Sequence, residues 1–325
     1  MVTYHLDMIL DPKHLVQLTE ILDAKSFTIA AERLNTSQPA LSRMATALEA
    51  QLGAPVFASR RNPVTPTALG VELANYGRAI RTATEQISHL AGRIAAGQQG
   101  EIRVGAPPFH SQRVATGFIA SWLQRHPEIR IVLQNGYAPA LLTQLVEGEL
   151  DLIMAPVDVI EGIPNLIVER LTRGENVILC RAGHKLLSVD RVTPDDLSQA
   201  RWITHARGSL LNRDTRAALT AVGVDYIDLP AFESNSASAM NAVMLNSDML
   251  TVLPDLIAGS LVESGGYAVL PFRLPGPYRP FGYITHEARQ NPALVAFRKE
   301  LTIDIRKADA RARAICEQAF TRTDS

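Results

Sequence analysis

The chain has 325 residues, a formal net charge of −1 at pH 7 and a hydrophobic fraction of 46%. This length and composition are typical of a globular protein with about two or three domains, each large enough to bury a core. No stretch approaches the roughly 18 apolar residues of a membrane-spanning helix, and the first residues lack a basic segment followed by an apolar run. The sequence therefore predicts a cytoplasmic protein with no membrane partner.

Motifs for catalysis and metal binding are absent from the sequence. Cys180 and Cys316 lie far apart and outside any C-x-x-C spacing, which predicts neither a disulfide framework nor a zinc site. The eight histidines show no metal-ligand spacing, and there is no G-x-S-x-G, P-loop, G-x-G-x-x-G or H-E-x-x-H motif. His110 and Ser111 do not predict a triad, because sequence neighbours rarely face each other productively. We expect no catalytic residue, no metal and no cofactor.

Residues 10–67 are predicted to form a helical domain around a helix-turn-helix at Phe27–Thr46. The first helix carries small apolar residues that a second helix can cross closely, and polar turn residues follow it. Ser37 is a good N-cap for the second helix, and Pro39 suits its first turn, where a missing N–H costs little. Pro63–Pro66 breaks helical structure and ends the domain.

The second helix of this pair has an apolar arc and an opposite polar arc. On the polar arc, Gln38 can bond an adenine edge, Arg43 can bond guanine, and Ser42 can reach a phosphate or a base. An ordinary solvated helix face would contain the same residue types, and the basic excess of the domain is slight. From the residues alone, both interpretations stay open.

The run A-A-E-R-L-N-T-S-Q-P-A-L-S-R, followed by A-L-E-A-Q-L-G-A-P-V-F, resembles the signature of the LysR-type transcriptional regulator family. The resemblance covers nearly the whole chain. It implies an α/β protein with an N-terminal winged helix-turn-helix, a long dimerisation helix and a C-terminal, two-lobed, periplasmic-binding-protein-like effector domain. It also implies that a double-stranded DNA operator is contacted by Ser37, Gln38, Pro39, Ser42 and Arg43.

The predicted wing departs from the family pattern, because Ser59 and Asn62 stand where arginines are usual. Arg60 and Arg61 lie between them and are the remaining candidates for wing contacts to DNA. Wing contacts are therefore less firmly implied than those of the recognition helix. The family function also allows for contact with RNA polymerase.

An apolar stripe recurs at spacings of four and three within residues 68–97, which predicts a long helix with a heptad seam. Such a helix, roughly 40 Å long, cannot bury the stripe against itself, so we predict a homodimer or homotetramer. Packing against the chain's own domain is the alternative. Gly70 and Gly77 are expected to weaken the helix locally, and residues 97–100 to act as a linker. The seam consists of Leu69, Leu73, Tyr76, Ile80, Ala83, Ile87, Leu90 and Ile94.

Beyond the linker, short apolar strands alternate with helices, which predicts a parallel sheet with right-handed crossovers. A second set of strands and helices follows, so we expect two α/β lobes joined by crossing strands. A late helix, Pro292–Lys307, could return to the first sheet. The predicted boundaries are 98–310 for the effector domain, 100–170 and 273–306 for lobe I, 171–272 for lobe II, and 311–325 for a C-terminal tail.

Open parallel sheets bind ligands at the carboxyl ends of their strands, near helix N-termini. Four such positions are expected to meet in the cleft between the lobes. The family resemblance places an effector there, often an organic acid, an aromatic acid or an amino acid. The histidine, arginine and hydroxyl groups suit a carboxylate, and the aromatic residues suit a ring. The candidates are Phe109, His110, Ser111, Tyr137, Thr204, Arg207, Ser209, Ser234 and Ser236.

Each candidate has a purely structural alternative. A serine before a helix is simply a cap, His110 could lie in a surface loop, and Arg207 could pair with Asp214. Phe109 stands where the family frequently has Ser or Thr, which favours a differently shaped or more apolar ligand. The sequence thus predicts a regulator that senses a small molecule; the alternatives are a periplasmic-type solute-binding protein and an enzyme with an accessory helix-turn-helix.

Overall fold

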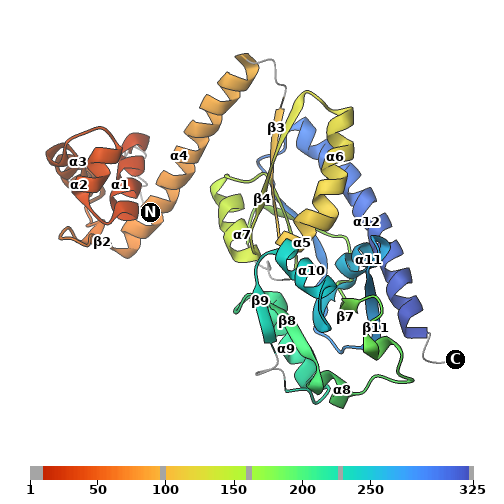
Figure 1. Ribbon diagram of the computed structural model, residues 1–325. Coiled ribbons are helices and arrows are strands. Elements are labelled where there is room, and N and C mark those ends of the chain that lie inside the picture. The colour runs from red at the N-terminus through yellow and green to blue at the C-terminus, as the bar shows by residue number, and fades with distance from the viewer. Residues whose placement is uncertain (1–9, 96–99, 159–162, 226–229, 322–325) are drawn as a thin grey trace, which may run out of the picture. The chain divides into compact units, whose positions relative to one another are not determined.

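The computed structural model describes residues 10–95, 100–158, 163–225 and 230–321 of the protein (Figure 1). It divides into two units, the first built from the chain up to Gln98 and the second from almost all of the remainder. In the described part of the chain, no helix has the length and apolar character needed to cross a membrane.

The first unit opens with three short helices, each of which begins at a side-chain cap. Asp11, Ser26 and Ser37 accept hydrogen bonds from backbone N–H groups of the first turns that follow them. Lys25 and Asn35 adopt left-handed backbone conformations where the chain turns between helices. The helices are α1 (Pro12–Ala24), α2 (Phe27–Arg33) and α3 (Gln38–Leu52), and their apolar faces meet in one buried core.

A small antiparallel wing closes this core. Its strands are β1 (Phe57–Ser59) and β2 (Thr65–Pro66). Phe57 is buried and its ring centroid lies 5.3 Å from that of Phe27 on α2. The N–H of Val64 donates to the carbonyl oxygen of Lys25 at 2.9 Å, which fixes the returning strand beside α1. The predicted winged helix-turn-helix is confirmed.

A long helix, α4 (Ala68–Ala95), packs closely on α1 through small residues. A Cβ at Gly77 would lie 2.2 Å from both the Leu15 carbonyl oxygen and the Thr19 hydroxyl, and one at Gly70 would lie 2.0 Å from the Val56 carbonyl oxygen. Besides the local weakening that the sequence predicts, these glycines have a packing role that only the structure shows. They allow backbone-to-backbone contact that any side chain would prevent.

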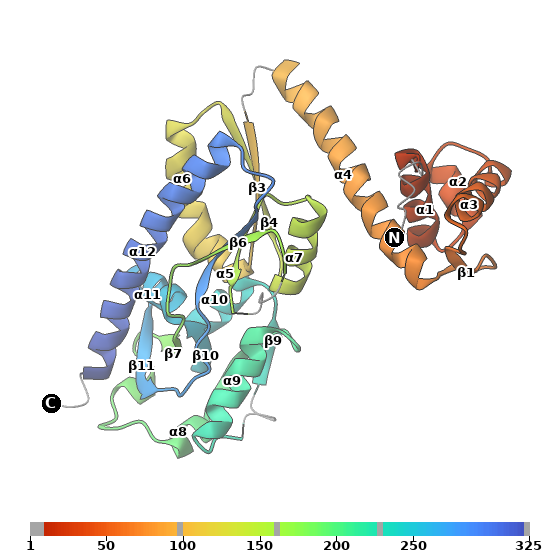
Figure 2. The same ribbon diagram turned by 180° about the vertical axis from the view of Figure 1, so that it is seen from behind.

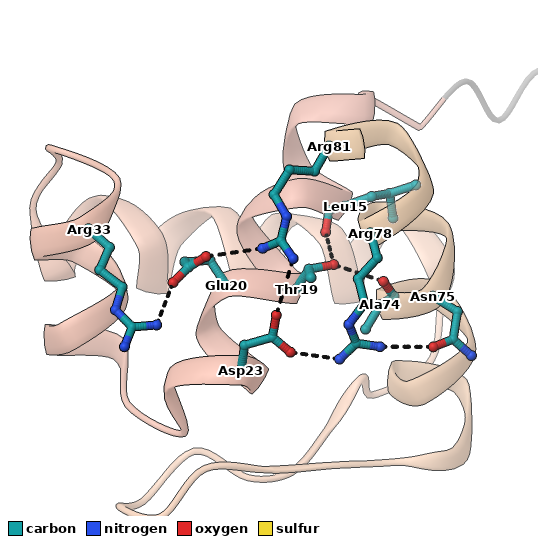
Figure 3. A network of polar contacts seen from close by, with 9 residues as sticks. All are labelled: Leu15, Thr19, Glu20, Asp23, Arg33, Ala74, Asn75, Arg78 and Arg81. Atoms are coloured by element: carbon teal, nitrogen blue, oxygen red, sulfur yellow. Dashed lines mark hydrogen bonds and ion pairs between the residues drawn. The ribbon is translucent and has the colours of Figure 1, made fainter. Parts of the chain in front are cut away.

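Charged residues lock α4 onto the three-helix head, as Figure 3 shows. Asp23 on α1 accepts from Arg78 at 2.6 Å and lies 3.6 Å from Arg81. Glu20 lies 3.0 Å from Arg33 on α2 and 3.3 Å from Arg81. Because one acidic pair joins three helices, a displacement of α4 is expected to carry the head with it.

The predicted heptad seam lies on another side of α4 from the α1 contact. Tyr76 and Ile87 are 63% and 68% exposed, so the α1–α3 head does not cover the stripe there. Leu73 is partly buried against the head. The side chains of Leu90 and Ile94, and the predicted linker residues 97–99, lie outside the described residues.

Lobe I of the second unit is a mixed five-stranded sheet with the order β4-β3-β5-β12-β6. Strand β3 lies between β4 and β5 and is parallel to both, whereas β12 is antiparallel to β5 and β6. The expected parallel sheet is thus extended by β6, which follows β5 in the chain, and by the antiparallel strand β12, which the chain inserts between β5 and β6 when it returns from lobe II. The strands are β3 (Gly100–Ala106), β4 (Ile129–Asn135), β5 (Leu152–Pro156), β6 (Leu166–Arg170) and β12 (Phe281–His286).

The helices of lobe I follow its parallel strands. After β3 the chain enters a short helix, a π-helical turn and a regular helix in direct succession. Phe118 and Trp122 of that regular helix pack edge-on against Phe297, with centroid distances of 5.0 and 5.2 Å. These segments are α5 (Pro108–His110), the π-helical turn (Ser111–Ala115), α6 (Thr116–Arg125) and, after β4, α7 (Ala138–Glu147).

Lobe II has a second five-stranded sheet, with the order β11-β7-β10-β8-β9. Strand β8 is parallel to both β9 and β10, and β7 is antiparallel to β10 and β11. Residues 171–175 and 274–280 pass between the two sheets, as predicted for two lobes joined by crossing strands. The strands are β7 (Asn176–Arg181), β8 (Arg201–His205), β9 (Pro230–Ser234), β10 (Met249–Pro254) and β11 (Tyr267–Arg273); the helices are α8 (Pro194–Gln199), α9 (Leu210–Ala221), α10 (Ala237–Leu245) and α11 (Asp255–Glu263).

The last helix, α12 (Pro292–Thr321), extends well beyond Lys307, which is its predicted end. Residues 311–321 are thus a packed helix and not a free tail. The helix contacts β3 and α6 of lobe I and then β11 and α11 of lobe II (Figures 1 and 2). Ala312 and Cys316 are buried, and a Cβ at Gly259 of α11 would lie 2.4 Å from the Ala312 Cα. One hydrophobic core therefore extends through both lobes along this helix.

Candidate nucleic-acid interface and ligand pocket

The first half of α3 presents a polar, exposed face. Ser37, Gln38, Pro39 and Arg43 are exposed and Ser42 is half-buried, so the structure brings all five predicted contact residues onto one surface. The side-chain amide of Gln38 donates to the Ser42 hydroxyl at 2.8 Å, which orients it. Arg43 makes no ion pair within the described part of the chain. A helix with Gln and Arg on its exposed N-terminal turns has the donors and acceptors that base edges require.

Arg60 is tied to α3 instead of extending freely from the wing. Its guanidinium pairs with Glu49 and donates to the Thr46 hydroxyl at 2.9 Å. Glu49 also accepts from the backbone N–H groups of Val56 and Phe57, at 2.8 and 3.1 Å. Burial raises the pKa of Glu49, but these N–H groups and Arg60 outweigh it and leave the pKa below its ordinary value. Arg60 therefore positions the wing against the helix.

Arg61 differs from its neighbour. Its backbone N–H donates to the Ser59 hydroxyl at 3.2 Å, while its side chain makes no ion pair with any described residue. Arg61 is exposed. Of the two wing arginines, it is the one whose charge is available to a phosphate.

A cavity of about 580 Å³ lies in the second unit, with walls from both lobes. Lobe I supplies the loop after β3 and the start of α7, and lobe II supplies residues around α9, α10 and the end of β10. Its volume falls in the range of about 300–1,000 Å³ that is typical of small-molecule sites. Most of the wall is apolar, including Phe109, Tyr137, Leu211, Met240 and Phe281.

The structure brings five of the nine predicted effector residues to the cavity wall, namely Phe109, His110, Tyr137, Arg207 and Ser209. Ser209 also caps α9, where its hydroxyl accepts from the Asn212 N–H at 3.2 Å. For this residue the structural and ligand-binding interpretations are therefore compatible.

The other four predicted residues do not line the cavity. Ser111 is buried in the π-helical turn, and the Thr204 hydroxyl is buried and accepts from the Asn212 side-chain amide at 2.8 Å. The Ser234 hydroxyl accepts from the N–H of Ser236, and the Ser236 hydroxyl caps α10. Ser111 and Thr204 therefore lie away from the cavity wall, and the Thr204 hydroxyl is already bonded to Asn212.

Two buried histidines face the cavity as neutral rings. His110 stacks on Phe281 with a centroid distance of 3.8 Å, and the His205 ring meets Phe109 edge-on at 5.6 Å. Burial lowers the pKa of His110 to about 3, assisted by His205, and lowers that of His205 to about 4. The alternative of a surface-loop His110 is wrong, and neither ring supplies a positive charge near neutral pH.

Arg207 pairs with Glu233, not with Asp214. Its Nε lies 3.3 Å from Glu233 Oε2, and its backbone N–H donates to Oε1 at 3.0 Å. Asp214 instead pairs with Arg279, which belongs to a crossing segment 65 residues away in the chain. The alternative of an Arg207–Asp214 pair is therefore wrong.

An ion-pair cluster that no sequence motif indicated includes two residues of the cavity wall, Arg279 and Asp214, and a third residue, Asp158, that lies outside it. Arg279 donates through Nη2 to Asp214 Oδ1 at 2.9 Å and through Nη1 to Asp158 Oδ2 at 2.6 Å. The bonds to Asp214 are the main cause of the raised pKa of Arg279. Asp158 follows β5 in lobe I and Asp214 belongs to α9 in lobe II. No local motif could have revealed this cluster, because its members are widely separated in sequence.

Among the described residues, no group of three or more His, Cys, Asp or Glu side chains is arranged to hold a metal ion. Cys180 and Cys316 are buried, and burial raises the pKa of each thiol to about 12. Such thiols stay protonated and unreactive at neutral pH.

Comparisons with known proteins agree with both regions. Residues 12–71 match the family model for a bacterial regulatory helix-turn-helix protein of the lysR family, and residues 95–303 match the LysR substrate binding domain. The chain is 27% identical to the HTH-type transcriptional regulator GalR of Pseudomonas putida, covering 87% of this chain and 71% of that one. It is 30% identical to the SDS degradation transcriptional activation protein of a Pseudomonas species, covering 88% and 92%. The structure of full-length CbnR complexed with its target DNA shares the fold, with a TM-score of 0.58, 18% identity, and coverage of 92% of this chain and 100% of that one.

Proposed function

The chain belongs to the LysR family of bacterial helix-turn-helix regulators, and we propose that it reads its operator through α3 and responds to a small molecule held between its lobes. The polar, exposed first half of α3 carries this proposal. Gln38 and Arg43 lie within the first two turns of α3, and their side chains can bond the groups that adenine and guanine present in the major groove. Arg61 would contact a phosphate from the wing, which adds affinity but little sequence preference.

Dimerisation through α4 would complete the DNA-binding surface. A dimeric helix-turn-helix protein reads two half-sites that lie about one helical turn apart or a multiple of that. The exposed Tyr76 and Ile87 provide an apolar stripe for a second copy of α4, and the ion pairs of Glu20 and Asp23 fix each head to its helix. The spacing between the two α3 helices would then be set by the α4 pair.

The effector would act from the cavity that both lobes line. A ligand shifts a regulator only through different affinities for its two states, so residues on both walls are the natural contacts. Phe109 and His110 of lobe I and Arg207 of lobe II meet these conditions. The activity expected of the protein is therefore regulation of transcription.

Selection of binding sites from random-sequence DNA by the full-length protein tests the DNA-reading proposal. We expect an enriched site with two half-sites, and a loss of roughly 1–3 kcal/mol in affinity for that site with Gln38→Ala or Arg43→Ala at fixed salt. Lys13→Ala, on α1, is the control for loss of charge, because Lys13 is exposed and makes no ion pair with a described residue. Unchanged affinity and base preference in both α3 variants would contradict the assignment.

A further inference from the structure

We propose that the effector is an uncharged ring compound with hydroxyl or amide donors, and that Asp158 and Asp214 make the cavity reject carboxylates. The proposal rests on the proposed function, since it concerns the ligand of the same cavity. It departs from the acidic effectors that the sequence resemblance implies, because Arg279, the least exposed cation of the wall, is already bonded to two carboxylates.

The charge balance at Arg279 carries the argument. Its side chain is the least exposed arginine on the cavity wall, at 25%, yet it bonds two carboxylates. Nε and Nη2 serve Asp214, and Nη1 serves Asp158. One guanidinium and two carboxylates leave this cluster with a formal charge of −1. A ligand carboxylate would therefore meet net repulsion at the cation that would otherwise attract it.

The other basic side chains do not replace Arg279. Arg207 is paired with Glu233, and its side chain is 88% exposed. Arg213 is an exposed lining residue, so water screens its charge. The rings of His110 and His205 are neutral, and any ionised fraction of the wall residue Asp255 adds negative charge.

The remaining surface suits a neutral ring. Phe109, Tyr137 and Phe281 offer aromatic faces and edges, and burial of a ring against them is favourable without any charge to desolvate. On the wall itself, Asp255 Oδ2 is buried and has no hydrogen-bond partner among the described residues. A hydroxyl or amide N–H of the ligand would satisfy this oxygen when Asp255 is ionised, whereas a carboxylate has no proton to donate.

Matched probes that differ only in charge test this inference on the full-length protein. We choose 2-naphthamide and 2-naphthoate, and measure their dissociation constants by calorimetry. In the wild type the amide should bind at least about tenfold more tightly than the carboxylate. Asp158→Asn should reduce that ratio by about tenfold, because it removes one negative charge and releases an N–H of Arg279.

Two further variants make the comparison specific. Asp248→Asn is the matched control. It also removes a carboxylate that pairs with an arginine, Arg181, but neither of these two residues lines the cavity. Its amide-to-carboxylate ratio should equal that of the wild type. Leu211→Trp should fill the cavity and abolish binding of the amide. Asp158→Ser, which removes the same charge, replaces Asp158→Asn if that variant does not fold.

Three results would overturn the inference: 2-naphthoate binding the wild type as tightly as the amide, an unchanged ratio in Asp158→Asn, or no binding of either probe by that variant. Operator affinity is measured on the same samples. If the protein binds its selected operator but the ratio does not change, only the ligand class is wrong. If the wild type binds no operator, the proposed function itself fails.

Discussion

Arg60 of the wing forms an ion pair with Glu49 of α3, so one contact joins the wing to the helix that carries the predicted base-reading residues. Glu49 also holds the N–H groups of Val56 and Phe57, where the wing begins. The orientation of the wing is therefore determined from α3. Arg60, which the sequence suggests as a DNA contact, is thus already paired with a carboxylate of its own chain.

The first prediction separates the two wing arginines. Arg60→Ala should lower the melting temperature and weaken operator binding, and Glu49→Gln should have similar effects. Because the pair is partly exposed, their coupling in a double-mutant cycle should be about 1 kcal/mol or less. Arg61→Ala should leave the melting temperature unchanged and reduce the salt dependence of operator binding by about one phosphate contact. Equal melting temperatures for Arg60→Ala and wild type would refute the positioning role.

The second prediction concerns the close contact of α4 with α1. Gly77→Ala should destabilise the first unit by about 1–3 kcal/mol or more, because its Cβ would overlap the Leu15 carbonyl and the Thr19 hydroxyl. Gly117→Ala in α6 is the control, since nothing lies within 4 Å of the added Cβ. That change should be neutral or stabilising, as alanine favours helix over glycine. Thermal unfolding of both variants, followed by circular dichroism, makes the comparison.

The third prediction addresses self-association. Ile80→Glu combined with Ile87→Glu should place unpaired charges in the proposed α4 seam, and so weaken both dimerisation and operator binding. Ala79→Glu adds a charge at an exposed position off the seam and should leave association unchanged. Sedimentation velocity at several concentrations measures the effect. An unchanged oligomer in the double variant would show that α4 is not the dimer contact.

The fourth prediction is a pH dependence of stability. The pKa of His110 is about 3 in the folded protein and near 6.5 when exposed, so the unfolded chain binds more protons between these values. Stability contributed by the neutral ring is present above pH 6.5 and is lost as the pH falls toward 3. His110→Phe should therefore show a smaller fall in melting temperature from pH 7 to pH 5 than the wild type. Phe109→Leu, which titrates nothing, should keep the wild-type slope; equal slopes for all three proteins would contradict the assignment.

The fifth prediction tests the packed end of α12. A chain that ends at Ala310 loses the buried Ala312 and Cys316, and should be destabilised by about 2 kcal/mol, or roughly 4–8 °C in Tm. Arg311→Ala changes an exposed position of the same helix and should have little effect. A truncated protein that melts at the wild-type temperature would show that this segment does not join the lobes.

Several elements could be predicted because their signals are local. The N-cap at Ser37, the polar turn before it and the exposed Gln38 and Arg43 follow from residues within about three helical turns of each other. The alternation of strands and helices likewise indicated two α/β lobes. The close packing at Gly70 and Gly77 could not be predicted, because it depends on the carbonyl groups of Val56 and Leu15, which approach α4 only after folding.

The amino-acid sequence by itself determined the helix-turn-helix, the periodicity of α4 and the two-lobed α/β class, because propensity, capping and hydrophobic spacing act over a few residues. Only the tertiary structure decided which groups became available to a partner. It joined Arg60 to Glu49, buried the Thr204 hydroxyl, neutralised Arg279 with Asp158 and Asp214, and extended α12 across both lobes. Such pairings depend on distances between segments far apart in the chain, which no local pattern of residues encodes.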